Sequence, residues 1–352
     1  MLQGLSYVPL LHLRLAEMRA LQELPDLTKR LLLPVIKMRP WLNSASLTRA
    51  FDRVTDSLGD GRFGLDLDET KLDRSNPRVP YVEFSRLFDE NDGFSIYYET
   101  VESISTAVPV MRKLGSRFHL INRQLEHINN IGRGCFVRID TRNPENYLRV
   151  ARLVNQSAAE NFVFIFDCGW REDVLSQSAI CIGLINNLLD ENPNFEVIVA
   201  GSSFPNSFAG RGDRFSIQIG ERLLFQEVRR HVNRGDVYYG DWGSTRPPSD
   251  PVPMVNVPRI DLATSTSWNC WRSNGESYEE VAQRIVDDEL WNGNLDLWGE
   301  YMIQCTADGL DPAIRSPATA AAVRINLHLN IQANFDSPNG SSLNDELVGD
   351  DL

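Results

Sequence analysis

Carboxylates and cations recur at the ends of short apolar runs in this sequence. The carboxylates are Asp66, Asp68, Asp140, Asp167 and Asp241. The cations are Lys37, Arg39, Arg138, Arg142 and Arg246. Because side chains alternate along a strand, Asp66 and Asp68 would share one face, as would Lys37 and Arg39. If these faces point inward, acids and cations converge at one end of the fold.

Such a mixture of charges suits two kinds of chemistry. Carboxylates hold a divalent cation such as Mg²⁺, or they act as general acid and base. Arginine and lysine grip the phosphate or carboxylate of a ligand. Together they would suit metal-assisted hydrolysis of a phosphorylated substrate, with one Asp as base and Arg138 or Arg246 neutralising the developing charge. The five Asp residues are therefore the candidate catalytic groups.

The same charges have a simpler interpretation, in which acids and cations neutralise one another in pairs. A catalytic site would hold unpaired acids open to solvent, whereas a scaffold would match each acid with Arg or Lys. The sequence leaves both alternatives open.

Two smaller motifs follow apolar runs. The segment Gly201-Ser202-Ser203-Phe204-Pro205 matches neither a GxSxG elbow nor a P-loop. It predicts a tight loop, with Ser202 and Ser203 as candidate members of an anion cradle. No histidine adjoins Cys168 in the sequence, so we expect a packed, unreactive thiol there.

Three tryptophans, Trp242, Trp268 and Trp271, lie in a segment that also holds Arg246 and Arg272. Tryptophan beside arginine would stack a nucleic-acid base or anchor a protein partner, with Trp242 and Trp268 as ligand-binding candidates. Alternatively, these tryptophans cover the top of the fold.

The elements that must position these side chains come from eight apolar runs. They span Leu5–Leu11, Leu31–Met38, Arg62–Asp68, Ala107–Met111, Cys135–Thr141, Asn161–Cys168, Phe195–Ser202 and Asp236–Asp241. Most are too short for helices and are rich in Val, Ile and Phe, which is typical of strands buried on both faces. Helical patterns between them begin at Asn143–Pro144 and span Val174–Leu189 and Phe215–Val232.

Strands that alternate with helices predict parallel βαβ units and an α/β fold, and eight of them predict a (βα)₈ TIM-barrel-like arrangement. The alternative is an open doubly wound sheet, but no glycine-rich turn follows the first run. We assign residues 1–243 to the barrel core. Residues 244–334 would close the same domain with a Pro-rich loop, a hairpin over 257–263 and 265–271, and helices over 277–291 and 318–333. Residues 335–352 are expected to form a disordered acidic tail.

Composition limits the classes of function. The formal net charge of −13 disfavours nucleic acid, although a local basic groove would still bind it. The five cysteines and five histidines are scattered, which argues against disulfides and against a metal site built on them. No apolar run is long enough for a membrane span, and charges interrupt the N-terminal apolar stretch, so we expect a cytoplasmic protein.

Several short segments resemble the phage beta protein family. They are Tyr7-Val8-Pro9-Leu10-Leu11 followed by Glu17, Leu33-Pro34-Val35-Ile36, Ala200-Gly201-Ser202-Ser203-Phe204-Pro205 and Tyr239-Gly240-Asp241-Trp242-Gly243-Ser244. The family usually carries Lys and Gly just before the early Glu, where this chain has Leu15 and Ala16. The resemblance implies a setting of phage–host conflict rather than a particular reaction.

Three hypotheses for function follow. The first is a defence or prophage barrel protein whose charged pocket binds a phosphate-bearing ligand and hydrolyses it with a metal. The second is a non-catalytic sensor or scaffold that binds a partner protein encoded nearby. The third is a binder of single-stranded nucleic acid, whose affinity would fall steeply with added salt.

Overall fold

The computed structural model describes residues 1–247 and 257–335, which form two compact units. Unit 1 comprises residues 1–14, 33–204 and 220–250, of which 248–250 lie outside the described part. Unit 2 comprises residues 15–32, 205–219 and 251–352, of which 251–256 and 336–352 lie outside the described part. The division of a single domain near residue 243 remains a prediction. The predicted disordered tail and most of the predicted Pro-rich loop fall outside the described residues.

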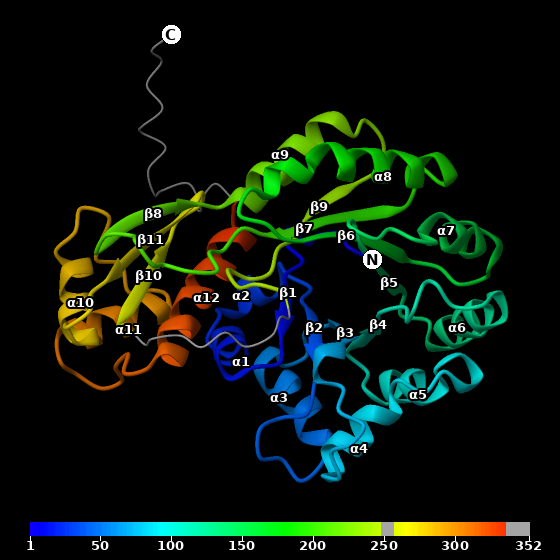
Figure 1. Ribbon diagram of the computed structural model, residues 1–352, viewed down its shortest axis with the longest axis horizontal. Coiled ribbons are helices and arrows are strands. Elements are labelled where there is room, and N and C mark those ends of the chain that lie inside the picture. The colour runs from blue at the N-terminus through cyan, green and yellow to red at the C-terminus, as the bar shows by residue number, and fades with distance from the viewer. Residues whose placement is uncertain (248–256, 336–352) are drawn as a thin grey trace. The chain divides into compact units, whose positions relative to one another are not determined.

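The described part of unit 1 contains eight strands in two parallel sheets (Figure 1). The first sheet consists of β1 (Leu10–His12), β2 (Val35–Met38), β3 (Phe63–Leu67) and β4 (Ala107–Pro109), paired in that order. The second consists of β5 (Cys135–Asp140), β6 (Phe162–Trp170), β7 (Glu196–Ser202) and β9 (Val237–Tyr239), also in that order. Each strand overlaps one of the eight predicted runs. The predicted α/β fold with parallel strands is confirmed.

Two isolated parallel bridges connect the edges of these sheets. Val110, just after β4, pairs with Phe136 of β5, and Tyr7, just before β1, pairs with Tyr239 of β9. Backbone hydrogen bonds accompany both bridges: Met111 N donates to Phe136 O at 2.8 Å, and Val8 N donates to Tyr239 O at 3.0 Å. The two sheets are thus linked at both pairs of edges, although neither bridge extends into a ladder.

Helices follow the strands of unit 1 and lie outside them (Figure 1). They are α3 (Thr48–Leu58), α4 (Val79–Arg86), α5 (Ser95–Ser103), α6 (Phe118–Ile131), α7 (Tyr147–Gln156), α8 (Ser178–Glu191) and α9 (Gly220–His231), with the short 3₁₀ helices η1 (Glu69–Lys71), η2 (Asn91–Gly93) and η3 (Val174–Gln177). The predicted helix start at Asn143–Pro144 was wrong. Asn146 has φ 65°, a left-handed conformation that cannot continue a helix, so α7 begins at Tyr147.

Unit 2 combines an antiparallel sheet with helices. Its strands β8 (Arg214–Gln218), β10 (Arg259–Ala263) and β11 (Ser267–Arg272) pair in the order β10-β11-β8. Its helices are α1 (Leu15–Gln22), α2 (Asp26–Lys29), α10 (Tyr278–Val286), α11 (Trp298–Ala307) and α12 (Pro317–Ala333). The predicted hairpin is confirmed as β10–β11. The predicted helix from Phe215 was wrong at its start, because residues 214–218 pair with β11 instead and α9 begins only at Gly220.

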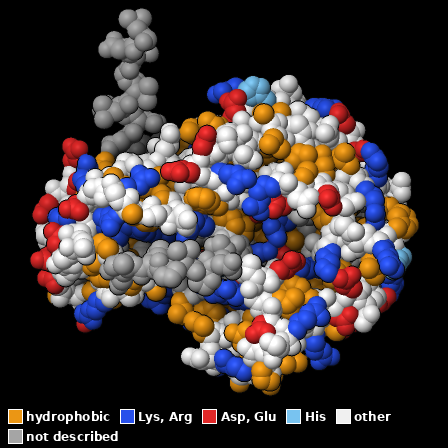
Figure 2. Space-filling model, in the orientation of Figure 1, with side chains coloured by type: hydrophobic (Ala, Val, Ile, Leu, Met, Phe, Trp, Pro, Cys, Tyr) orange, Lys and Arg blue, Asp and Glu red, His pale blue; other side chains and the backbone are white. Residues whose placement is uncertain are grey.

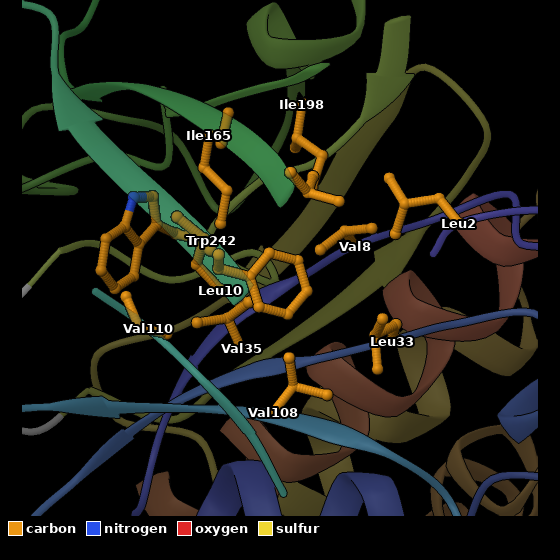
Figure 3. Close-up of a cluster of buried hydrophobic side chains, with 13 residues drawn as sticks. Leu2, Val8, Leu10, Leu33, Val35, Val108, Val110, Ile165, Ile198 and Trp242 are labelled. Atoms are coloured by element: carbon orange, nitrogen blue, oxygen red, sulfur yellow. The ribbon is translucent and has the colours of Figure 1, made fainter. Parts of the chain in front are cut away.

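The core of unit 1 lies between its two sheets. It takes alternate residues from both, including Leu10, Val35, Val110, Ile165 and Ile198, and the indole of Trp242 closes one side (Figure 3). This period of two is that of strands packing one face inward. Over the described residues, no helix is both long and apolar enough to cross a bilayer.

Candidate functional site

A layer of polar side chains begins where the core of unit 1 ends. Two positions beyond core residues Leu10, Val35, Val110, Phe136, Ile165 and Ala200, the sequence has His12, Lys37, Arg112, Arg138, Asp167 and Ser202. Because side chains alternate, each of these continues the inward face of its strand at its carboxyl end. With Asp66 and Trp242 we call this set the polar layer.

Asp66 is the centre of the polar layer. Its Oδ2 accepts from Lys37 Nζ at 2.9 Å and from Arg138 Nε at 2.9 Å, and its Oδ1 accepts from Arg112 Nη1 at 3.0 Å. The Asp66 side chain is 1% exposed, whereas Arg138 retains 27%. Arg138 is therefore the member of this group that solvent or a ligand reaches.

The charges of this group control one another's ionisation. Burial opposes ionisation of Asp66, but the Lys37, Arg138 and Arg112 charges outweigh burial and hold the Asp66 pKa well below its ordinary value. Burial and the neighbouring Arg138 lower the pKa of Lys37. Asp66 is consequently a fixed anion that organises three cations, and it is a poor general base at neutral pH.

Asp167 connects the group to Trp242. Arg138 Nη1 lies 3.3 Å from Asp167 Oδ2, and Asp167 Oδ1 accepts from Trp242 Nε1 at 3.1 Å and from Gly169 N at 2.9 Å. Trp242 thus has its ring in the core and its N–H in the polar layer. Both oxygens of Asp167 are occupied by these donors.

His12 stands at the end of β1, in register with Lys37 of β2. Its Nε2–H donates to the Arg246 carbonyl oxygen at 2.8 Å, which leaves Nδ1 as a buried nitrogen with no hydrogen-bond partner in the described part of the chain. Burial, then the charge of Arg14, lower the His12 pKa to about 3, and Arg39 and Lys37 act in the same direction. His12 is neutral at physiological pH and surrounded by cations.

Further charges lie beyond the polar layer on the same strand faces. Arg39 Nη1 is 3.8 Å from the buried Asp68, and Asp140 pairs with Arg142 through a 2.8 Å bond from Arg142 Nε. The Asp140 and Arg142 side chains are 37% and 50% exposed. Figure 2 shows Lys and Arg side chains gathered around a hollow over the strands of unit 1.

The acids of this region are matched with cations or other donors. Among the described residues there is no group of three or more His, Cys, Asp or Glu side chains placed to hold a metal ion. All five cysteines are free and buried, including Cys168, in line with the expected packed thiol.

The profile of the Beta protein family matches residues 7–334 of this chain. Protein beta of Enterobacteria phage P4 is 30% identical over 341 residues, which cover 94% of this chain and 93% of the phage protein. The chain belongs to the Beta protein family. This membership confirms the resemblance found in the sequence and indicates a phage-related protein. No solved structure gives a significant match.

All eight residues of the polar layer lie within the segment matched to the Beta protein family. Eight predicted site residues do not belong to this layer. Arg39, Asp68, Asp140 and Arg142 lie beyond it, and Arg246 contacts His12 through its carbonyl oxygen. The other three lie elsewhere. Asp241 is buried on the other face of its segment, where it accepts from Tyr7 Oη and, at 2.7 Å, from Tyr239 Oη. Ser203 donates to Glu221 Oε2 at 2.6 Å, and Trp268, in unit 2, donates to His328 Nδ1 at 3.3 Å.

Of the remaining predicted residues, Ser202 is in the polar layer, where its Oγ donates to Thr245 O at 2.6 Å. Sequence reasoning missed His12 and Arg112 as site residues of this Beta protein family member. A signal for both was present, because each stands two positions beyond an apolar strand residue, as Lys37 and Arg138 do. His12 was overlooked because its strand was expected to end at Leu11.

Proposed function

We propose that this Beta protein family member binds a phosphate-bearing anion at the polar layer, in the mouth of a (βα)₈-type barrel. The barrel is supported by eight parallel strands in two sheets, whose edges are linked by the Val110–Phe136 and Tyr7–Tyr239 bridges. It is also supported by the inward face of these strands, which is apolar in the core of unit 1 and polar at the carboxyl ends of the strands. Ligands of barrels of this class bind at that end.

The observation that carries the proposal is the local excess of positive charge. The polar layer holds three cations, Lys37, Arg112 and Arg138, against two acids, and Arg112 also pairs with the exposed Glu69 beyond the layer, in a chain whose net charge is −13. Arg14 and Arg39 extend the positive field toward His12. Guanidinium groups with low exposure and several fixed donors suit a phosphate better than isolated surface lysines do.

Binding is better supported than hydrolysis. Catalysis by the predicted aspartates requires a carboxylate that takes a proton or ligates a metal, yet Asp66 and Asp167 already accept from cations and N–H donors. A mouth whose acids are already occupied by donors is the arrangement expected of a sensor. We therefore propose a ligand-binding sensor that acts in phage–host conflict; its relative in phage P4 supports a phage-related role.

The second candidate function is a scaffold for a partner protein. It is favoured by the same matching of acids with cations, because a scaffold needs no free acid. The nucleic-acid hypothesis has less support. Trp242, Trp268 and Trp271 are each 1% exposed or less, so their ring faces are covered by protein and offer no platform for base stacking.

The proposal is tested by measuring ligand affinity calorimetrically with inorganic phosphate, pyrophosphate and ADP. A ligand at about 100 times its dissociation constant also stabilises the fold by about 2.7 kcal/mol, so thermal unfolding provides a second readout. We expect Arg138→Gln to weaken binding at least tenfold. Arg152→Gln is the matched control, because Arg152 pairs with Glu191 on the helices of the same unit.

No binding of any of these anions to the wild-type protein would refute the anion site and leave the scaffold as the better hypothesis. Equal loss in Arg138→Gln and Arg152→Gln would show that binding is a nonspecific charge effect. Circular dichroism of both variants establishes that each remains folded.

A further inference from the structure

Two buried acceptor atoms beside the cations have no hydrogen-bond partner among the described residues. They are His12 Nδ1 and Asp68 Oδ2, on side chains that are both fully buried. The other oxygen of Asp68 accepts from Thr70 N at 3.2 Å and from Thr70 Oγ1 at 2.7 Å. Arg39 Nη1 lies 3.8 Å from Asp68 Oδ2, which is too far for a hydrogen bond.

Buried acceptors without donors are costly, and in native proteins they are rare. Both belong to the inward strand faces that carry the cations. His12 is in register with Lys37, which is in register with Asp66, and Asp68 lies two positions beyond Asp66. The strand register therefore places both acceptors beside the cations of the polar layer.

Resting on the proposed anion site, we infer that its ligand is a phosphate monoester whose carbon skeleton carries hydroxyl groups, such as a sugar phosphate. The phosphate is held by the Arg138 side of the layer, and hydroxyl groups donate to His12 Nδ1 and Asp68 Oδ2. A hydroxyl suits both acceptors because it donates one proton without adding charge. The ribose phosphate part of a nucleotide offers the same chemistry.

The state of His12 fits this role. The Nε2–H bond to the Arg246 carbonyl fixes the tautomer in which Nδ1 carries a lone pair. Burial and the nearby Arg14 keep the pKa of His12 at about 3, so the ring remains an acceptor over the physiological range. A protonated ring would donate at Nδ1 and would reject a hydroxyl proton.

The test compares ribose 5-phosphate with ethyl phosphate, a monoester of the same charge that carries no hydroxyl group. Calorimetric titration of the wild-type protein should give an affinity for ribose 5-phosphate at least tenfold higher. Asp68→Asn keeps the shape and the acceptor for Thr70, but it presents an N–H donor at the second position. This variant should bring the ratio of the two affinities, ribose 5-phosphate over ethyl phosphate, close to one. Its affinity for ethyl phosphate should change less than about threefold.

His12→Phe should reduce the ratio in the same way, and Arg152→Gln should leave it unchanged. Equal wild-type affinities for the two monoesters would overturn the hydroxyl inference and leave the anion site standing. Absence of binding by either monoester, and by phosphate, would instead refute the proposed function. A tenfold preference that survives both Asp68→Asn and His12→Phe would show that the hydroxyl groups bind elsewhere. The wild-type comparison is decisive even if a variant fails to fold.

Discussion

Arg138 Nε lies 2.9 Å from Asp66 Oδ2, although 72 positions separate the two residues in the chain. Arg138 is on β5 and Asp66 is on β3, so this ion pair connects the two parallel sheets of unit 1. The pair does so directly above the apolar core that the sheets share. The same contact therefore stabilises the fold and holds Arg138 in position for a ligand.

Replacement of Asp66 by Asn should be strongly destabilising. The change removes the carboxylate that Lys37, Arg112 and Arg138 share. Arg138 keeps Asp167 and Arg112 keeps Glu69, but the buried Lys37 loses the carboxylate with which it pairs. Loss of one partner of a buried charge pair costs about 3–5 kcal/mol. Urea unfolding followed by circular dichroism measures the change.

Asp140→Asn is the matched control for this variant, because Asp140 pairs with the half-exposed Arg142. Exposed pairs of this kind contribute about 0–1 kcal/mol. Similar losses of stability in the two variants would mean that Asp66 has no special role in organising the cations.

Gly64 is expected to tolerate no larger residue. A Cβ atom at this position of β3 would lie 2.9 Å from Val35 Cγ2 and 3.0 Å from the Phe136 ring. Gly64→Ala should therefore overpack the core and lower the free energy of unfolding by about 1–3 kcal/mol. In Gly183→Ala, on helix α8, the new Cβ meets no atom within 4 Å, so stability should rise by about 0.5–1 kcal/mol. Loss of stability in both variants, measured by thermal unfolding, would contradict this view of the core.

The strands could be predicted from the sequence because strands buried on both faces appear as apolar runs. The site could be predicted only in part. The charges at strand ends identified Lys37, Asp66, Arg138 and Asp167, but the same rule also selected Asp241, which faces Tyr7 and Tyr239 on the other side of its strand. A one-residue difference in strand register changes the face on which a side chain lies.

The strand β8 could not be predicted from local pattern, because its pairing partner β11 lies about 50 positions later in the chain. In residues 214–218, exposed polar side chains alternate with the partly buried Phe215 and Ile217, so the segment lacks the continuous apolar run that revealed the strands of unit 1. The distinction between matched and unpaired acids also depends on contacts between distant segments, and no spacing in the sequence encodes it.

Trp242→Phe should separate the two roles of this side chain. Phenylalanine retains most of the ring in the core, but it removes the Nε1–H that Asp167 accepts at 3.1 Å. The buried carboxylate oxygen loses one donor and the ring becomes smaller. Together these changes should lower the free energy of unfolding by about 1–3 kcal/mol. Chemical unfolding measures the change. Trp298→Phe, on α11 of unit 2, is the control for loss of a tryptophan, and equal effects would argue against a specific bond to Asp167.

Glu221 should make the stability of the protein depend on pH. Burial and the nearby charge of Asp241 raise its pKa to about 7, while hydrogen bonds from Ser203 act in the opposite direction. Because this pKa is higher in the folded state than in the unfolded chain, Glu221 contributes stability that is complete below about pH 4.5 and is lost as the pH rises through about 7. The contribution is on the order of 3 kcal/mol.

The measurement is the free energy of unfolding of the wild-type protein and of Glu221→Gln at several pH values from about 5 to about 8. Among the described groups with a shifted pKa, Glu300 and His12 also make stability depend on pH in this range. Burial raises the pKa of Glu300 to about 7, so Glu300 adds to the loss of stability as the pH rises. The pKa of His12 is lowered to about 3, so His12 makes stability increase with pH up to about pH 6.5. Both are present in the two proteins, so the difference between the curves isolates Glu221. We expect the wild-type advantage to decrease steadily with pH, and a constant difference would mean that the carboxyl group of Glu221 does not change its protonation in this range.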